Sequence, residues 1–285
     1  MELEPAGIIP PDDDPVLGRD PAVERVEQAL GRGREQEALD LAEAALKSGE
    51  GSRVDLMFLA GDALLALGRA VDAEQRLRQV LNEDPECPVA RCWLAMALYR
   101  QSRFDESHVE CDRALVAHQP AVDIHVVRGL LLERSGEFDA ADKSFRTAAE
   151  LDPVRFQTPH RLTREEFDKE VRLAAERLPL EFREHLERVP VLVHDLPALE
   201  LLRGDSAPGT DPDLLGLFHG VPLPDVMEAG GCEPTPNYIY LFQRNLERFA
   251  VDRGDLVAQI AITLYHELGH YLGLEEEDME PLGLD

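Results

Sequence analysis

The sequence predicts a mainly α-helical chain, in which an N-terminal solenoid of repeated helix pairs precedes a small α+β domain. Three observations lead to this fold class. A short marker recurs about every 34 residues in the front half of the chain. After Pro153, short β-rich runs alternate with prolines and glycines. Near the C-terminus, a long apolar helical pattern carries two histidines four residues apart.

The repeat marker has the form Gly-x-x-x-x-Ala. It occurs at Gly33, Gly68 and Gly136, and Ser102 takes the place of the glycine in the third copy, so the spacings are 35, 34 and 34 residues. An apolar helix is expected before and after each of the later markers, over residues 56–67 and 73–81, 90–99 and 106–116, and 124–132 and 140–149. We therefore expect four helix pairs over residues 22–153.

These copies resemble the tetratricopeptide repeat. The resemblance depends on small residues at an early and a late position and on aromatic residues near the turn, namely Gly61, Gly129, Ala114, Ala148, Phe104 and Phe138. It implies a curved solenoid whose inner surface holds a peptide or protein partner, and the alternative is a passive spacer. Some family members bind a C-terminal carboxylate with Lys and Asn. Because Asn82 is the only asparagine in the repeats, no such clamp is expected.

The composition is strongly acidic, with a formal net charge of −28. Such a charge repels nucleic acid and anionic membranes and favours basic peptides or partners, although a role in solubility explains it equally well. The chain has no apolar run long enough for a membrane span, and residues 1–21 are acidic and proline-rich. We expect a disordered acidic tail over 1–21, no secretion signal and a cytoplasmic location. Disulfides are not expected, because no Cys-x-x-Cys pair occurs among Cys87, Cys92, Cys111 and Cys232.

The composition changes after the repeats, and we assign residues 160–285 to a second domain. Thr163 is expected to cap a helix that runs through residue 178, with Glu166 at the capping-box position. A second helix is expected over residues 180–188. These two helices lead into the β-rich part of the chain.

Three short β-rich runs predict a small sheet beside the C-terminal helix, at residues 191–194, 215–221 and 238–242. The prolines and glycines between residues 208 and 236 are expected to form the loops. His219 and Tyr240 are candidates to line a cleft. An extended substrate would pair with an edge of the sheet, which is either the strand at 215–221 or the strand at 238–242.

Residues 255–274 have the pattern of a buried helix, with Leu or Ile on one face at Leu256, Ile260, Leu264, Leu268 and Leu272. Asp252 or Asp255 is expected to cap its start. Gly273 is expected to end it in a left-handed turn, because a residue with a Cβ resists that conformation.

Within this helix, residues 266–270 read His-Glu-Leu-Gly-His. Residues four apart share one face of a helix, so His266 and His270 can bind a single zinc ion. Glu267 lies about 100° round the axis and can reach a metal-bound water from the side, as a general base does. Since zinc lowers the pKa of bound water from about 15.7 to about 7, the implied reaction is hydrolysis of an amide bond.

Catalytic zinc usually takes a third protein ligand and a water. In the long zinc-protease pattern, His-x-x-Gly-x-x continues to the third ligand, and this position is Glu276. Glu275, Glu277 and Asp278 are rival candidates, and a residue upstream of the motif is the remaining alternative. Most carboxylates of this acidic run are expected to be solvated, since the metal needs one of them.

Together with the motif, the order of the elements over residues 163–284 resembles a family of small bacterial zincin-like metallopeptidases. The resemblance implies a minimal catalytic domain with zinc on His266, His270 and the acidic residue Glu276, and with Glu267 as the base. Aspartate is more usual at the third position, so the longer Glu276 is a departure from the family pattern. The sequence thus predicts a zinc metallopeptidase whose repeats recruit a protein partner or substrate.

Two other functions fit part of the sequence. A non-catalytic adaptor would bind a partner through the repeats and use zinc structurally. Glu267 argues against it, because a structural site needs no base and fills its fourth position with protein. A zinc amidase acting on a small molecule would leave the solenoid without a role.

Overall fold

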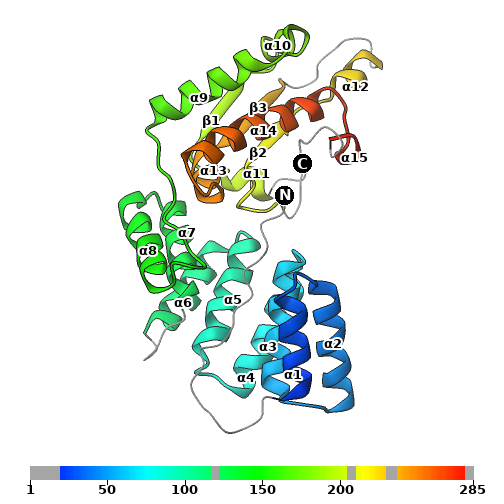
Figure 1. The fold of residues 1–285 in the computed structure, drawn as a ribbon, viewed down its shortest axis with the longest axis vertical. Coiled ribbons are helices and arrows are strands. Elements are labelled where there is room, and N and C mark those ends of the chain that lie inside the picture. The colour runs from blue at the N-terminus through cyan, green and yellow to red at the C-terminus, as the bar shows by residue number, and fades with distance from the viewer. Residues whose placement is uncertain (1–19, 117–121, 204–209, 229–235, 280–285) are drawn as a thin grey trace. The chain divides into compact units, whose positions relative to one another are not determined.

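The computed structural model describes residues 20–116, 122–203, 210–228 and 236–279, without the side chains of Glu181 and Glu276. The acidic tail expected over residues 1–21 lies almost wholly outside this part, and so does Cys232. The chain divides into two compact units, one within residues 2–157 and the other within residues 158–285. Figure 1 shows helices in the first unit and helices around a small sheet in the second. The predicted fold class is confirmed.

The first unit consists of four antiparallel helix pairs, as expected. Its helices are α1 (Pro21–Leu30), α2 (Glu35–Ser48), α3 (Arg53–Ala66), α4 (Ala70–Glu83), α5 (Pro88–Arg100), α6 (Phe104–Leu115), α7 (Asp123–Arg134) and α8 (Phe138–Leu151). Each helix packs against the next, and α1, α3, α5 and α7 also pack against one another in series. These four helices form the inner layer of the solenoid.

The repeat marker marks the turn between the two helices of a pair. Gly33, Gly68 and Gly136 have positive φ values of 64°, 71° and 76°, and Ser102 adopts the same conformation with φ of 57°. A left-handed residue costs roughly 1–2 kcal/mol when it carries a Cβ, which explains why three of the four copies have glycine there. The small residues at the early and late repeat positions allow neighbouring helices to pack closely. At Gly129, a Cβ would lie 2.5 Å from Cε1 of Phe145 on the neighbouring helix.

The second unit begins with the capping box predicted for α9. The Thr163 hydroxyl accepts a hydrogen bond from the Glu166 N–H, and the Glu166 carboxylate accepts one from the Thr163 N–H. The unit contains α9 (Arg164–Arg177), α10 (Leu180–Leu186), β1 (Val191–His194), α11 (Leu199–Arg203), β2 (Gly216–His219), α12 (Leu223–Glu228), β3 (Tyr238–Phe242), α13 (Gln243–Phe249), α14 (Arg253–Tyr271) and α15 (Glu276–Met279). The four short helices α11, α12, α13 and α15 were not predicted from the sequence. Of these, α12 falls where only loops were expected, and Pro224 stands in its first turn, where a helix tolerates proline.

The sheet has the strand order β1-β3-β2. β1 runs parallel to β3, with Val191 opposite Ile239, and β2 runs antiparallel to it, with Leu217 opposite Tyr240. β3 is therefore central. This corrects the expectation that the strand at 238–242 could serve as an edge, because neighbours occupy both of its sides. The edges are β1 and β2.

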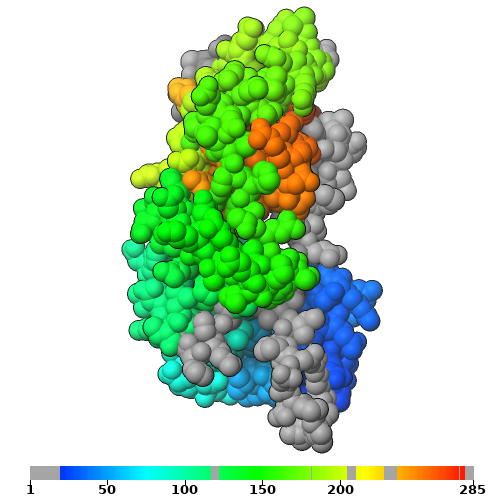
Figure 2. Space-filling model, turned by 60° about the vertical axis from the view of Figure 1, so that its left-hand side comes forward, coloured from blue at the N-terminus to red at the C-terminus, as the bar shows by residue number. Residues whose placement is uncertain are grey.

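The core of this unit lies on one face of the sheet, under α9 and α14. Ile239 and Leu241 of β3 are fully buried together with Leu264 of α14 and Phe167 of α9. Figure 2 shows the green surface of α9 directly beside the orange surface of α13 and α14. Full burial of such a side chain contributes about 1.5–3 kcal/mol, so the sheet and α9 hold α14 in place.

Two expectations about the whole chain concern cysteines and membranes. The three described cysteines, Cys87, Cys92 and Cys111, are free thiols. Among the helices that the structure describes, none combines the length and the apolar character needed to cross a bilayer.

Candidate metal centre

The long helix α14 carries the His-Glu-x-x-His motif. Its N-cap is Asp252, whose carboxylate accepts a hydrogen bond of 2.9 Å from the Asp255 N–H. After the helix ends at Tyr271, Gly273 turns the chain with φ of 85°. A Cβ at Gly273 would also lie 2.7 Å from Cγ of Pro224, so glycine is needed for both conformation and space. The predicted cap and the predicted end of the helix are both confirmed.

The two motif histidines converge. Nε2 of His266 and Nε2 of His270 lie 3.0 Å apart, and both rings are half-buried. Two nitrogens at about 2.0 Å from one tetrahedral ion would lie about 3.3 Å apart. Nδ1 of His270 lies 3.3 Å from the carbonyl oxygen of Leu274. A proton on that Nδ1 leaves the Nε2 lone pair directed at His266, which is the tautomer a metal ligand needs. The pair thus fits two ligands of one zinc ion.

Glu267 lies beside the histidines, between α14 and the edge strand β2. This residue is 7% exposed, and its Oε2 accepts a hydrogen bond of 2.6 Å from the backbone N–H of Phe218. A Cβ at Gly216 would lie 2.9 Å from Oε1 of Glu267. Sequence reasoning missed Gly216 and Phe218. The available signal was a glycine inside an apolar strand, which indicates a close approach of another part of the chain.

The acidic run after Gly273 lies at the start of α15. This short helix is anchored by Met279, which is fully buried and packs on α14 where Gly269 leaves room, since a Cβ there would lie 3.1 Å from the Met279 sulfur. Within the described residues, no third His, Cys, Asp or Glu joins the two histidines in a metal-binding group. The rival candidates for the third ligand, Glu275, Glu277 and Asp278, are all exposed. The side chain of Glu276 lies outside the described part, so its role as third ligand stays a prediction.

The two candidate cleft residues lie away from the motif. Ile239 and Leu241 of β3 face α14, so Tyr240 between them faces the opposite side of the sheet. His219 shares that side, with its ring centroid 6.4 Å from that of Tyr240. The structure therefore does not bring His219 and Tyr240 together with His266 and His270.

A further aromatic residue fixes the end of the motif helix. Tyr271 follows His270 directly and is 1% exposed. Its ring packs edge-on against His185 of α10 and against Phe218 of β2, with centroid separations of 5.9 Å in both cases. Nothing in the sequence indicated these contacts. They lock α14 to the edge strand next to the candidate metal ligands.

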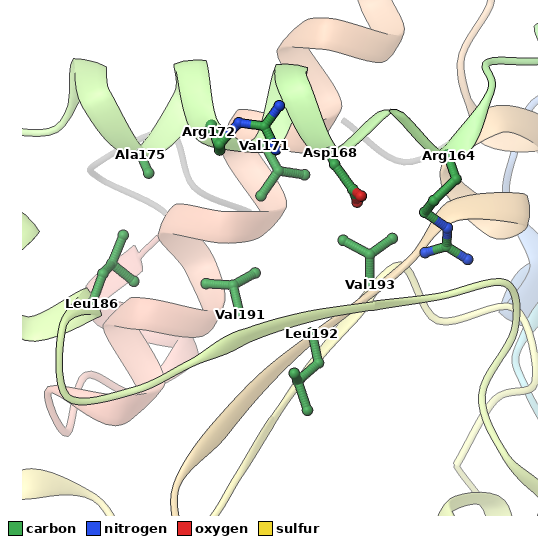
Figure 3. Close-up of a pocket in the computed structure, with 9 residues that line it drawn as sticks. All are labelled: Arg164, Asp168, Val171, Arg172, Ala175, Leu186, Val191, Leu192 and Val193. Atoms are coloured by element: carbon green, nitrogen blue, oxygen red, sulfur yellow. The ribbon is translucent and has the colours of Figure 1, made fainter. Parts of the chain in front are cut away.

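The second unit also has a hollow of about 540 Å³ between α9 and β1. Figure 3 shows Val191 and Val193 pointing toward α9, whereas Leu192 points away from it. Arg164, Asp168 and Arg172 line the polar side of the hollow. None of its lining residues belongs to the motif, and it lies along the edge of the sheet opposite β2. The hollow is therefore separate from the candidate metal centre.

Comparisons with known proteins bear on both units. A family model described as a zincin-like metallopeptidase matches residues 186–284, and one described as a tetratricopeptide repeat matches residues 29–88 and 64–125. No curated protein matches the chain. The resemblances inferred from the sequence are thus confirmed at the level of domain families.

Two solved structures of tetratricopeptide-repeat proteins are similar to the chain. YrrB, described as having an unusual peptide-binding site, is 19% identical over 47% of this chain and 68% of its own, with a TM-score of 0.38. TTC0263, a thermophilic protein from Thermus thermophilus, is 22% identical over 59% of this chain and 90% of its own, with a TM-score of 0.42. The chain carries a tetratricopeptide region over residues 29–125 and a zincin-like metallopeptidase domain over residues 186–284.

Proposed function

We propose that the protein is a zinc-dependent peptidase whose repeat region recruits a protein partner or substrate. One observation carries the proposal. On a single helix of a zincin-like domain, two imidazole nitrogens converge to 3.0 Å beside a buried glutamate that is held at the edge of a sheet. This combination matches the needs of metal-assisted hydrolysis, because it offers ligands, a base and a place for an extended substrate.

His266 and His270 would hold the ion through their Nε2 atoms. An acidic residue beyond Gly273 would complete the set, and the spacing of the motif favours Glu276. When bound, zinc would act as a Lewis acid and lower the pKa of the water that attacks the peptide carbonyl.

Glu267 would act as the general base. Its carboxylate takes the proton from the attacking water and then delivers it to the nitrogen of the departing amine, as general acid–base catalysis requires. The Phe218 N–H orients this carboxylate, and low exposure strengthens its interaction with a proton donor.

The edge strand β2 would align the substrate. Leu217 pairs with Tyr240, so the neighbouring Phe218 directs its N–H away from β3 toward the open side of β2. Because that N–H reaches Glu267, the carboxylate lies at the open edge. An extended peptide that pairs with β2 would therefore pass directly in front of the base.

The repeats would recruit the partner. Tetratricopeptide solenoids present a continuous inner surface suited to peptides. The net charge of −28 favours a basic partner. A zinc-containing adaptor without turnover is the alternative.

Substitution of Glu267 by Gln tests the proposal. Glu267→Gln keeps both imidazoles, so it should bind zinc like the unmodified protein and lose hydrolysis of a quenched-fluorescent peptide library by about 10²–10⁴-fold. His266→Ala and His270→Ala should lose both zinc and hydrolysis. Glu184→Gln, on the exposed side of α10, is the matched control and should change neither. Full hydrolysis by Glu267→Gln would refute the mechanism.

The third ligand can be found in the same assay. Glu276→Ala should weaken zinc binding by at least about tenfold, whereas alanine at Glu275, Glu277 or Asp278 should leave it unchanged. X-ray absorption on the zinc-loaded protein gives the number and kind of zinc ligands, and so distinguishes the adaptor from the peptidase. Four protein ligands without a water would favour the adaptor over the peptidase.

A further inference from the structure

Asp62 is a buried acid on the inner layer of the repeats. It lies on α3, next to the small residue Gly61, and is 9% exposed. None of the described residues donates a hydrogen bond to its carboxylate. A buried carboxylate without a donor is costly, because it has lost water and gained no replacement. A hydrogen-bond donor to the Asp62 carboxylate would therefore lower the free energy of this part of the fold.

Two charged residues from other parts of the solenoid act electrostatically on Asp62. Asp123, at the start of α7, is 9% exposed and forms an ion pair with Arg155, which follows α8. Nη1 of Arg155 also lies 3.7 Å from Oδ2 of Asp152. The Cys92 thiol of α5 is 1% exposed and shares this environment, since the charges of Asp123 and Arg155 both act on it. Charges from the start of α7 and from the segment after α8 thus act both on Asp62 of α3 and on Cys92 of α5.

The charges at this place do not balance. Burial raises the pKa of Asp62 to about 7, the negative charge of Asp123 contributes to this rise, and Arg155 opposes it. Burial also raises the pKa of the Cys92 thiol well above its usual value, so this group stays neutral. Asp152 is partly exposed to water, whereas Asp62 and Asp123 are buried. Since Arg155 is already paired with Asp123, the ionised Asp62 leaves one buried negative charge without a counterpart. Nε of Arg155 is also buried and has no hydrogen-bond acceptor among the described residues.

We propose that Asp62, together with the Asp123–Arg155 pair, forms a subsite that takes one cationic group of a peptide partner, an ammonium or a guanidinium. A single cation supplies both things that the site lacks, a donor to the Asp62 carboxylate and one positive charge. This inference rests on the proposed recruiting function of the repeats and names the chemistry of the partner. It depends on binding alone and not on hydrolysis.

The test compares two peptides that differ in one charge. The probes are the acetylated, amidated pentapeptide Ala-Ala-Lys-Ala-Ala and its analogue with norleucine in place of lysine, which keeps the alkyl stem and lacks the ammonium. Binding is measured by titration calorimetry at about 0.15 M salt, with the full chain carrying Glu267→Gln to prevent turnover. At pH 8, the lysine peptide should bind at least about tenfold more tightly, as expected for a charge-assisted hydrogen bond.

Asp62→Asn should remove this preference to within about twofold. Asp55→Asn, an exposed change on the same helix, should keep it and thereby controls for the general attraction of a basic peptide to an acidic protein. Lowering the pH to 5.5 should weaken the preference in the parent protein, because protonation of Asp62 removes its charge. Unchanged Trp93 fluorescence of Asp62→Asn would verify that the repeats remain folded.

Two results would overturn the subsite. They are an equal affinity for the two probes in the parent protein, and a lysine preference that survives in Asp62→Asn. Failure of this test together with intact peptide hydrolysis by the unsubstituted protein would reject the subsite and leave the proposed peptidase standing. A lysine preference that depends on Asp62, found in a protein that hydrolyses no peptide, would reject the peptidase and leave the subsite.

Discussion

The backbone N–H of Phe218 donates a hydrogen bond of 2.6 Å to the carboxylate of Glu267, and so connects the edge strand β2 to the motif helix α14. This contact joins residues 49 positions apart. It exists because Gly216, two residues earlier on the same strand, leaves space for the Glu267 side chain. The position of the proposed base therefore depends on a glycine outside the motif.

Gly216→Ala should displace Glu267 and reduce hydrolysis. Its Cβ would lie 2.6 Å from Cγ2 of Thr263 and 2.9 Å from Oε1 of Glu267, so the helix or the carboxylate must move. A misplacement of about 1 Å costs about 100-fold in rate, which we expect in kcat with zinc content unchanged. Gly254→Ala, in the first turn of the same helix, is the control and should keep the parent rate. Parent activity in Gly216→Ala would show that the carboxylate does not need this strand.

Glu247 should be a major source of stability for the second unit. Its side chain is 1% exposed and accepts hydrogen bonds from Leu162 N–H at 2.9 Å, from Gln243 Nε2 at 2.8 Å and from Arg161 Nη1 at 3.0 Å. Glu247→Ala removes the buried acceptor that these three donors share and should cost about 3 kcal/mol in the free energy of unfolding, and Glu247→Gln about half as much.

Urea unfolding followed by circular dichroism measures the effect of Glu247. Trp93 is the only tryptophan and lies in the repeats, so its fluorescence reports the other unit and should show an unchanged midpoint. Glu184→Gln on exposed α10 serves as the control. A loss below about 0.5 kcal/mol for Glu247→Ala would contradict the role assigned to this network.

Gly129→Ala should destabilise the repeats. The added methyl would lie 2.5 Å from Cε1 of Phe145, which is itself 5% exposed and has little room to move. Overpacking of this kind costs about 1–3 kcal/mol, measurable by urea unfolding followed at Trp93. Phe145→Leu should recover part of the loss in the double variant, because it removes the clashing ring. Additive losses would mean that the two side chains do not meet.

Asp62 should make the stability of the repeats fall with rising pH. Its pKa is raised to about 7 in the folded chain, mainly by burial, from 3.8 in the unfolded chain. Between these values the folded state binds the extra proton, so the contribution of Asp62 to the free energy of unfolding decreases from about pH 4 to about pH 7 and is level above that. Asp62→Asn should therefore gain stability over the parent as pH rises, by at most about 4 kcal/mol at pH 8. A difference between the two proteins that is the same at pH 4 and pH 8 would contradict the shifted pKa.

Local sequence patterns predicted most of the helices and strands. The marker glycines indicated the left-handed turns of the repeats, because that backbone conformation disfavours a Cβ at a single position. Thr163 with Glu166, and Asp252 before α14, indicated helix starts, since a cap acts within three residues. The motif residues 266, 267 and 270 could be selected from the sequence because their relative directions depend only on the period of one helix.

Short helices were harder to predict. In α12 and α15 the apolar pattern is only a few residues long, and such segments gain their stability from contacts such as that of Met279 with Gly269. The candidates His219 and Tyr240 depended on which face of the sheet points to α14. Alternation along a strand gives two faces and does not say which one is covered.

Spacing along the chain was enough to predict the repeat architecture, the motif helix and the chemistry that its histidines and glutamate can perform, because these features depend on residues close together in sequence. The packed fold was needed to establish that β3 is central, that β2 presents Phe218 to Glu267, and that the charges of Asp123 and Arg155 act on Asp62. These relationships join segments far apart in the sequence, and their free energy comes from burial and close packing, which no local pattern encodes.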